Sequence, residues 1–96
     1  MAKKTSLDKR LHVYYSGSVQ GIGFRYTAER IAEPLKLTGW VKNLPDGRVE
    51  VMIEGNEPDI ELFLEKINDI FKSYIRDADA EWGEAIGEFS EFDIRF

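Results

Sequence analysis

The spacing of apolar residues changes its period several times along these 96 residues, and this succession constrains the fold more than any other feature. Apolar and polar residues alternate over Leu11–Ser16, which is the period of a strand with one buried face. After a glycine-rich segment, apolar residues recur at helical spacing at Phe24, Ala28, Ile31, Ala32 and Leu35. Pro34 cannot donate to the helical ladder, so we expect a kinked or tightened last turn there.

The middle of the chain has the pattern of a β-hairpin. Leu37–Asn43 is predicted as a strand, and Pro45–Gly47 follows it with the residues that favour a tight turn. Apolar residues then alternate with polar ones over Val49–Ile53, so the return strand has one buried and one wet face.

A second helix is predicted directly after the hairpin. Asn56 can cap it, Pro58 is tolerated in its first turn, and Asp59 is favourable there. Its apolar stripe consists of Ile60, Phe63, Leu64, Ile67 and Phe71. Alternation over Ala78–Trp82 and again over Phe92–Phe96 predicts two more strands.

The predicted order is therefore strand, helix, strand, strand, helix, strand, with an extra C-terminal strand. Right-handed crossovers place both helices on one face of a mainly antiparallel sheet, because only then do the helical stripes and the apolar strand faces share a core. The sequence predicts a ferredoxin-like α/β sandwich of the α+β class.

Composition excludes several kinds of chemistry. Cysteine is absent, so there is no disulfide, thiolate metal site or cysteine nucleophile. His12 is the sole histidine, and a zinc site or a catalytic triad would have to be built on that one residue of a strand. We therefore expect chemistry without a metal or another cofactor. The net charge of −5 argues against general binding to nucleic acid or to a membrane surface.

The start of the chain, Met1–Arg10, is basic and polar and does not resemble a secretory signal. The longest uncharged run, Leu11–Phe24, is short and contains polar residues and glycines. We expect a cytoplasmic protein with a flexible basic leader over residues 1–9 and one domain over residues 10–96. Basic residues outnumber acidic ones in the first third of the chain, so an anion site is expected there.

The glycine-rich segment Gly17–Gly23 has the pattern of an anion-binding loop. It opens directly into a helix, so its N–H groups and those of the first helical turn can converge on one anion. Arg25 adds a permanently charged fork that can hold two phosphate oxygens. An ordinary connecting turn followed by a solvated arginine fits the same spacing. The P-loop ending is absent, and Gly21-Ile-Gly23 lacks the third glycine of a dinucleotide fingerprint.

Two segments, Gly17–Arg25 and Gly39–Asn43, closely resemble the two signature segments of the acylphosphatase family. The resemblance continues in order and spacing through Asp46-Gly47, Glu54-Gly55, Gly87–Phe89 and Phe92–Phe96. It implies the ferredoxin-like fold and a metal-free hydrolase that cleaves the carboxyl–phosphate bond of acyl phosphates. The implied substrate is a small acyl phosphate, with inorganic phosphate as an inhibiting product, and the expected state is a monomer.

The resemblance also implies the roles of individual residues. Arg25 matches the phosphate-binding arginine, and Asn43 matches the asparagine that orients the attacking water. The implied phosphate loop comprises Val19, Gln20, Gly21, Ile22, Gly23 and Phe24. The sequence departs from the family pattern at Ile22, where valine is commoner, at Pro34 inside the helix, and at Lys36, where the family often has glycine. Lys36 is therefore expected in a left-handed conformation that glycine would adopt more easily.

The sequence offers few candidates for a general acid or base, which agrees with this chemistry. A carboxylate leaves without a general acid, and phosphoryl transfer needs mainly charge stabilisation and in-line positioning. We expect a phosphate oxygen of the substrate to take the proton of the attacking water.

Other patterns suggest other functions. An RNA-recognition module has the same element order, and Gly21–Phe24 echoes its aromatic signature, but the echo follows the first strand instead of lying on a central one. A non-catalytic anion-binding domain is a further alternative. The acidic residues Asp77, Asp79, Glu81 and Glu88 partly mimic a calcium loop, yet Trp82 stands where glycine is needed. Packing roles are expected for Tyr14, Tyr15, Trp40 and Trp82, and a local partner for His12.

Overall fold

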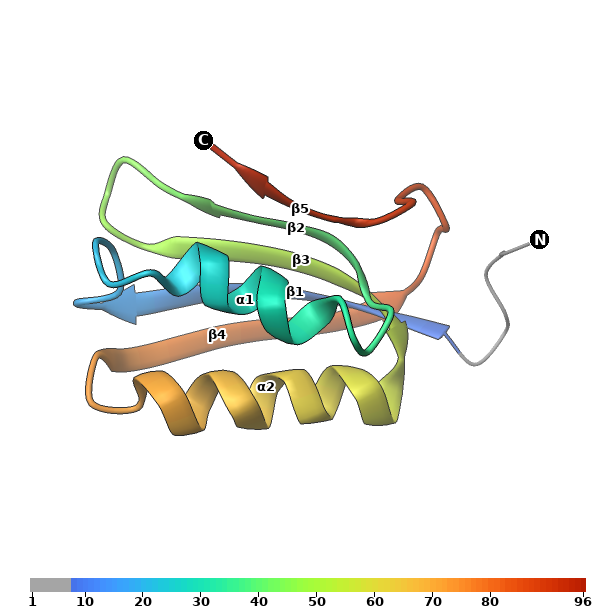
Figure 1. Cartoon of the computed structure of the whole chain (residues 1–96), viewed down its shortest axis with the longest axis horizontal. Coiled ribbons are helices and arrows are strands. Elements are labelled where there is room, and N and C mark those ends of the chain that lie inside the picture. Colours follow the sequence, from blue (N-terminus) through green and yellow to red (C-terminus); the bar gives the residue numbers. More distant parts are fainter. Residues whose placement is uncertain (1–7) are drawn as a thin grey trace.

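The computed structural model describes residues 8–96 as two helices and a 5-stranded sheet (Figure 1). The elements are β1 (Asp8–Gly17), α1 (Phe24–Ala32), β2 (Thr38–Asn43), β3 (Val49–Asn56), α2 (Glu57–Phe71), β4 (Ile75–Glu84) and β5 (Phe92–Arg95). The strand order across the sheet is β4-β1-β3-β2-β5. This is the predicted ferredoxin-like order with its extra C-terminal strand.

The pairing directions determine which chain ends meet. β3 lies in the middle of the sheet and pairs antiparallel with both β1 and β2, while β5 pairs parallel with β2. β1, β2 and β5 therefore run in the same direction. Their carboxyl ends, at Gly17, Asn43 and Arg95, meet at one edge of the molecule.

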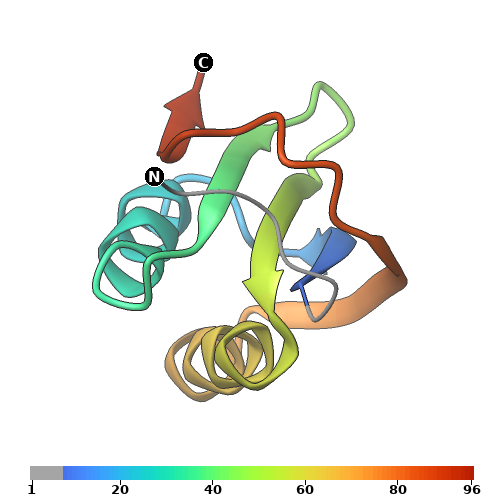
Figure 2. The ribbon, with the colours of Figure 1, turned by 90° about the vertical axis from the view of Figure 1, so that its right-hand side faces the viewer.

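Both helices lie on the same face of the sheet, and the other face is left uncovered (Figure 2). Alternation places Leu11, Val13 and Tyr15 toward the helices, as expected, and each is at most 3% exposed. The rings of Phe24 in α1 and Phe71 in α2 stack with centroids 4.8 Å apart and join the two helices. The buried cluster consists of Leu11, Val13, Tyr15, Val19, Phe24, Ala28, Ala32, Leu37, Val41, Val49, Val51, Ile53, Ile60, Phe63, Ile67, Phe71 and Phe92.

The first strand begins earlier than the expected domain boundary at residue 10. Asp8 and Lys9 pair with Asn56 and Gly55 of β3, which draws them into the sheet. These two residues of the expected leader therefore lie in β1, and the rest of that leader lies outside the described residues.

The end of α1 is tightened, as Pro34 predicts. The regular helix stops at Ala32, and the chain then closes with hydrogen bonds from Lys36 N to Glu33 O, 2.9 Å, and from Leu37 N to Ala32 O, 3.1 Å. This pair of bonds is a Schellman motif, which requires a left-handed residue. Lys36 occupies that position with a φ of 57°, in agreement with the expectation.

A buried carboxylate organises the connection from β4 to β5. Glu54 is 4% exposed and accepts hydrogen bonds from Arg10 Nε, 2.8 Å, from Ile86 N, 3.0 Å, and from Gly87 N, 3.1 Å. Arg10 also donates to Glu88 at 2.7 Å. The buried charge is thus paired and hydrogen-bonded, as burial requires.

Candidate active site

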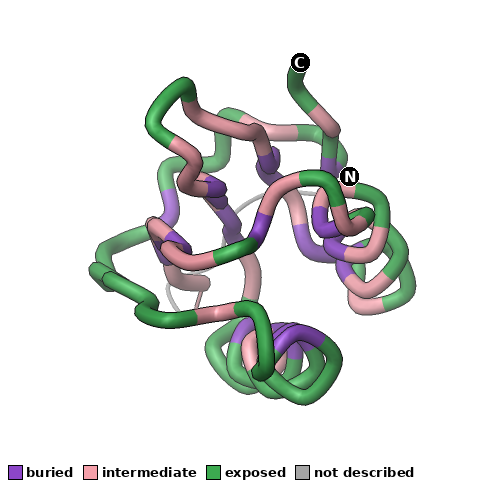
Figure 3. The backbone as a smooth tube through the Cα atoms, turned by 90° about the vertical axis from the view of Figure 1, so that its left-hand side faces the viewer, coloured by how far each residue is buried: buried purple, intermediate pink, exposed green. Residues whose placement is uncertain are grey.

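The residues singled out in the sequence gather where β1 and β2 end. The connection Ser18–Gly23 leads from β1 to α1, and Asn43 is the last residue of β2. Figure 3 looks onto this end of the molecule, where the connecting loops are largely exposed or half-buried. The fold therefore brings the two signature segments together although α1 separates them in the chain.

The loop is anchored at its start and open in its middle. Ser18 N donates to Tyr74 O at 2.9 Å, and Val19 is fully buried in the core. Gly21 and Gly23 have φ values of 80° and 79°, which side chains other than glycine rarely adopt. A Cβ atom at either position would meet nothing within 4 Å, so the dihedral angle, and not crowding, explains the glycines.

A row of backbone donors in this loop has no acceptor in the described chain. Within residues 8–96, the N–H groups from Val19 to Tyr26 donate to no carbonyl or side chain, and the first helical bond runs from Thr27 N to Gly23 O at 3.0 Å. Gly23 caps α1 without a side-chain hydrogen bond. Unpaired donors at a helix N-terminus and a preceding turn form an anion-binding arrangement.

Arg25 lies in the first turn of α1 with its charge uncompensated. Its Nη1 donates to Arg95 O at 3.4 Å, and its guanidinium lies 4.7 Å from the ring centroid of Phe96. Among the described residues it forms no ion pair with a carboxylate. The guanidinium is therefore held at the carboxyl edge of the sheet by neutral groups and keeps its full charge for an anion.

Asn43 presents a buried acceptor that the described chain leaves unpaired. Among the buried side-chain polar atoms of residues 8–96, Asn43 Oδ1 is the one without a hydrogen-bond partner. Such an atom is costly unless a donor such as a water molecule satisfies it. Its position beside the loop makes Asn43 suited to hold a water next to a bound anion.

The side chain of Gln20 has a role that the sequence pattern did not predict. Instead of facing the loop interior, its Nε2 donates to Leu44 O at 2.8 Å and to Arg48 O at 3.0 Å, both in the β2–β3 hairpin. These acceptors are backbone groups more than 20 residues away, so no local pattern could indicate them. The same hairpin is closed by Asp46, whose pKa is lowered by hydrogen bonds from the Arg48 backbone N–H and guanidinium.

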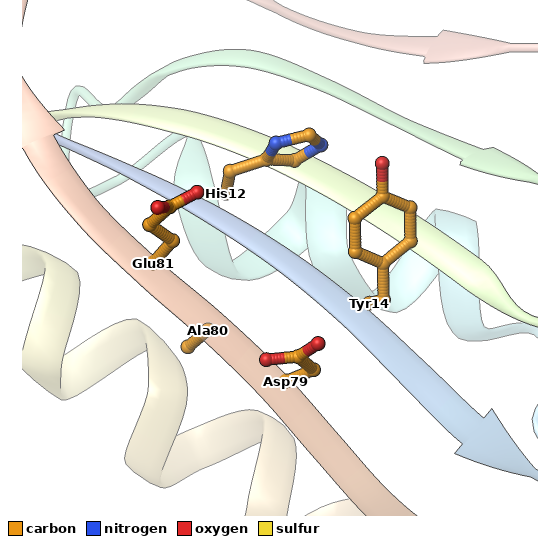
Figure 4. A pocket seen from close by; sticks show the side chains of 5 residues that line it. All are labelled: His12, Tyr14, Asp79, Ala80 and Glu81. Atoms are coloured by element: carbon orange, nitrogen blue, oxygen red, sulfur yellow. The ribbon is translucent and has the colours of Figure 1, made fainter.

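A depression of about 320 Å³ lies on the uncovered face of the sheet. Figure 4 shows His12 and Tyr14 on β1 beside Asp79 and Glu81 on β4. His12 Nε2 lies 2.6 Å from Glu50 Oε2, and partial burial together with Glu50 raises the pKa of Tyr14. The acidic lining is unsuited to an anion, and within residues 8–96 no group of three or more potential ligands could hold a metal ion.

The remaining aromatic and acidic residues have structural positions. Tyr15 is buried, and Trp40 is covered by the cations of Lys42 and Arg95 at 5.4 and 4.6 Å. Gly21–Phe24, the echo of an RNA-binding motif, lies in the loop and at the start of α1 and not on a sheet strand. The acidic residues compared with a calcium loop are exposed, and Glu88 is bonded to Arg10.

Fold and site together define a class: a ferredoxin-like α+β domain whose loop between the first strand and the first helix carries unpaired N–H groups. Comparison with known proteins agrees with this class. The family model described as acylphosphatase matches residues 11–94. The chain therefore belongs to the acylphosphatase family, as the two signature segments indicated, and is a hydrolase of that kind.

Individual relatives support the assignment. An acylphosphatase of Methanospirillum hungatei is 43% identical over 89 residues, which span 91% of this chain and 97% of that protein. The crystal structure of acylphosphatase from Bacillus subtilis superposes with a TM-score of 0.84 at 34% identity, covering 92% of this chain and 99% of that one. An acylphosphatase structure from Coxiella burnetii gives a TM-score of 0.75 at 35% identity, covering 99% and 100%.

The helices of the described residues are too short or too polar to cross a membrane.

Proposed function

We propose that this chain hydrolyses small acyl phosphates without a metal ion, with the loop and Arg25 holding the phosphoryl group and Asn43 orienting the attacking water. The observation that carries the proposal is the row of unpaired N–H groups from Val19 to Tyr26, beside a guanidinium that no carboxylate neutralises. In the proposed complex the N–H groups of Val19, Gln20, Gly21, Ile22, Gly23 and Phe24 surround the phosphoryl oxygens.

The proposed reaction is a single in-line displacement. The water oxygen forms a bond to phosphorus while the bond between phosphorus and the carboxylate oxygen breaks, and the acyl group leaves as a carboxylate with the electron pair. One water proton passes to a phosphoryl oxygen, so the products are the carboxylate and inorganic phosphate. Fixed amides and a guanidinium stabilise the charge on the equatorial oxygens, which is the main demand of a loose transition state.

Asn43 contributes position instead of charge. Its buried Oδ1 accepts a hydrogen bond from the attacking water, which directs a lone pair of that water toward phosphorus. Such alignment matters for the chemical step and much less for binding of the substrate. Neither the loop, nor Arg25, nor Asn43 supplies a carboxylate or imidazole, so the proposed reaction uses no protein base.

The test is hydrolysis of benzoyl phosphate by the purified full chain, with a chelator present. We expect turnover in the chelator, competitive inhibition by inorganic phosphate, and a kcat that shows no ionisation of a protein group near neutral pH. Asn43→Ala should lower kcat far more than it changes KM. Arg30→Ala, an exposed arginine further along α1, is the control and should keep wild-type kinetics. Absence of turnover, or turnover that requires a divalent metal, would contradict the proposal.

We further propose that the chain acts as a cytoplasmic monomer that binds neither nucleic acid nor membranes. The net charge of −5 supports this, because it repels polyanions at long range. Light scattering after size exclusion should give the monomer mass of 11.1 kDa. Salt-sensitive binding of single-stranded RNA would instead favour the RNA-recognition alternative.

A further inference from the structure

The amide of Gln20 connects two parts of the site that come from different elements. One part is the β1–α1 loop with its free N–H groups, and the other is the β2–β3 hairpin that begins directly after Asn43. Gln20 Nε2 donates to Leu44 O at 2.8 Å and to Arg48 O at 3.0 Å, so both hydrogens of the amide are used. Leu44 N also donates to Arg48 O, at 2.8 Å, which closes the hairpin at the same carbonyl.

We propose that Gln20 is a positioning residue that sets the distance between the bound phosphoryl group and the water held by Asn43. This inference rests on the function proposed above. In the proposed complex the backbone N–H of Gln20 donates to the anion, while its side chain holds the carbonyl of Leu44, the residue that follows Asn43. One residue thus serves the phosphoryl subsite with its main chain and, through Leu44, the position of Asn43 with its side chain.

The rest of the structure gives the loop little other attachment to the hairpin. Within residues 8–96, no further hydrogen bond joins the two segments. Val19 anchors the loop to the core, and Ser18 binds Tyr74, which lies outside the hairpin. Beyond Gln20 come Gly21 and Gly23, whose backbones are intrinsically free. Without the Gln20 amide, no hydrogen bond among residues 8–96 would join the loop to the hairpin that follows Asn43.

The expected consequence is a loss in the chemical step and not in phosphate binding. In-line attack depends on the relative placement of water and phosphorus, and small displacements lower its rate strongly. The N–H groups that bind the anion belong to the backbone and remain after a change of the Gln20 side chain. A purely structural role would instead lower stability and affect kcat only in proportion to the folded fraction.

The experiment compares Gln20→Met, which keeps the length of the side chain and removes its donors, with the wild-type full chain. We expect kcat for benzoyl phosphate to fall by about 10- to 100-fold. The inhibition constant of inorganic phosphate should stay within about twofold. Gln20→Asn keeps the amide on a shorter side chain and should show a smaller loss, and it replaces Gln20→Met if that variant does not fold.

Two further variants separate positioning from stability. Asn56→Ala removes the hydrogen bond from Asp59 N to Asn56 Oδ1 at the start of α2, far from the loop. It serves as a destabilised control with unchanged kcat. In an Asn43→Ala background, Gln20→Met should change kcat by less than about twofold, because the water that Gln20 helps to place is no longer held.

The outcomes distinguish this inference from the proposed function. An inactive wild type would contradict the function. If the wild type is active, three results would overturn the role of Gln20 alone. They are an unchanged kcat in Gln20→Met, a phosphate inhibition about tenfold weaker in that variant, and effects of Asn43→Ala and Gln20→Met that multiply independently.

Discussion

The two helices begin in opposite ways. At α2, Asn56 Oδ1 accepts a hydrogen bond from Asp59 N at 3.0 Å, a proline stands in the first turn, and Glu57 and Asp59 place negative charge at the positive end of the helix dipole. At α1, Gly23 supplies no side-chain cap, and the first turn carries no acidic residue. Arg25 puts a cation there instead, which the helix dipole disfavours.

This difference is the one that the proposed anion site at the start of α1 would require. A side-chain cap would occupy the free N–H groups, and an acidic residue in the first turn would repel an anion that those groups could bind. The start of α1 therefore gains little local stabilisation and depends on packing, through buried Phe24, Ala28 and Ala32 and the stacking of Phe24 on Phe71. No anion site is proposed at the start of α2, and its sequence provides both a side-chain cap and an acidic first turn.

Replacing the cation at the start of α1 should have the largest effect. We expect Arg25→Ala to lower kcat/KM for benzoyl phosphate by on the order of 10³-fold, the scale at which an arginine stabilises phosphoryl transfer. Asp59→Ala, the matched change in the first turn of α2, should leave kcat/KM unchanged. Steady-state kinetics of the two variants decide this, and equal losses in both would remove the contrast between the helices.

A bound anion should stabilise the start of α1, which has neither a side-chain cap nor an acidic first turn. Inorganic phosphate at 100 times its dissociation constant is expected to stabilise the fold by about 2.7 kcal/mol. The melting temperature should rise by on the order of 10 °C. Thermal unfolding with and without phosphate measures the shift. At the same phosphate concentration Arg25→Ala should show little of it, whereas a full shift in that variant would place the binding site elsewhere.

Removing the cap of α2 should affect stability alone. Asn56→Ala deletes the bond to Asp59 N and is expected to cost about 1 kcal/mol of unfolding free energy. Urea denaturation monitored by tryptophan fluorescence gives the value, and kcat should equal that of the wild type. A loss of activity without a loss of stability would contradict the assignment of α2 as a purely structural helix.

The smallest effect is expected at the other end of α1. Lys36 has a φ of 57° in the Schellman motif, a conformation that costs most residues about 1 to 2 kcal/mol and glycine nearly nothing. Glycine also has more freedom to lose on folding, so Lys36→Gly should stabilise the protein by a net of about 0.5 to 1 kcal/mol. Destabilisation in the same denaturation assay would show that the lysine side chain has a compensating contact.

Local patterns predicted the parts of this protein that local interactions determine. Asn56, Pro58 and Asp59 together predict the start of α2 correctly, and Pro34 indicates the tightened end of α1, whereas the left-handed Lys36 was expected from the family resemblance. The start of β1 at Asp8 was not predicted, because it depends on pairing with Asn56 across the sheet. The bonds of Gln20 to the hairpin and the burial of the Asn43 oxygen likewise arise only when distant segments meet.

The assignment of roles at the site came from a resemblance and not from periodicity. Spacing alone could not separate an anion loop from an ordinary turn, since both use Gly21 and Gly23 in the same way. The structure adds the unpaired N–H groups, which no pattern of residue types reveals. The proposed roles of Arg25 and Asn43 stay predictions until the variants are measured.

The outermost strand, β4, carries Asp77, Asp79 and Glu81 with exposed side chains along its length. If two molecules joined their sheets along this strand, the same carboxylates would lie close to one another, and their repulsion opposes such growth. Salt screens this repulsion while the exposed strand edge remains. Concentrated solutions at high ionic strength are therefore where aggregates of this protein should first form.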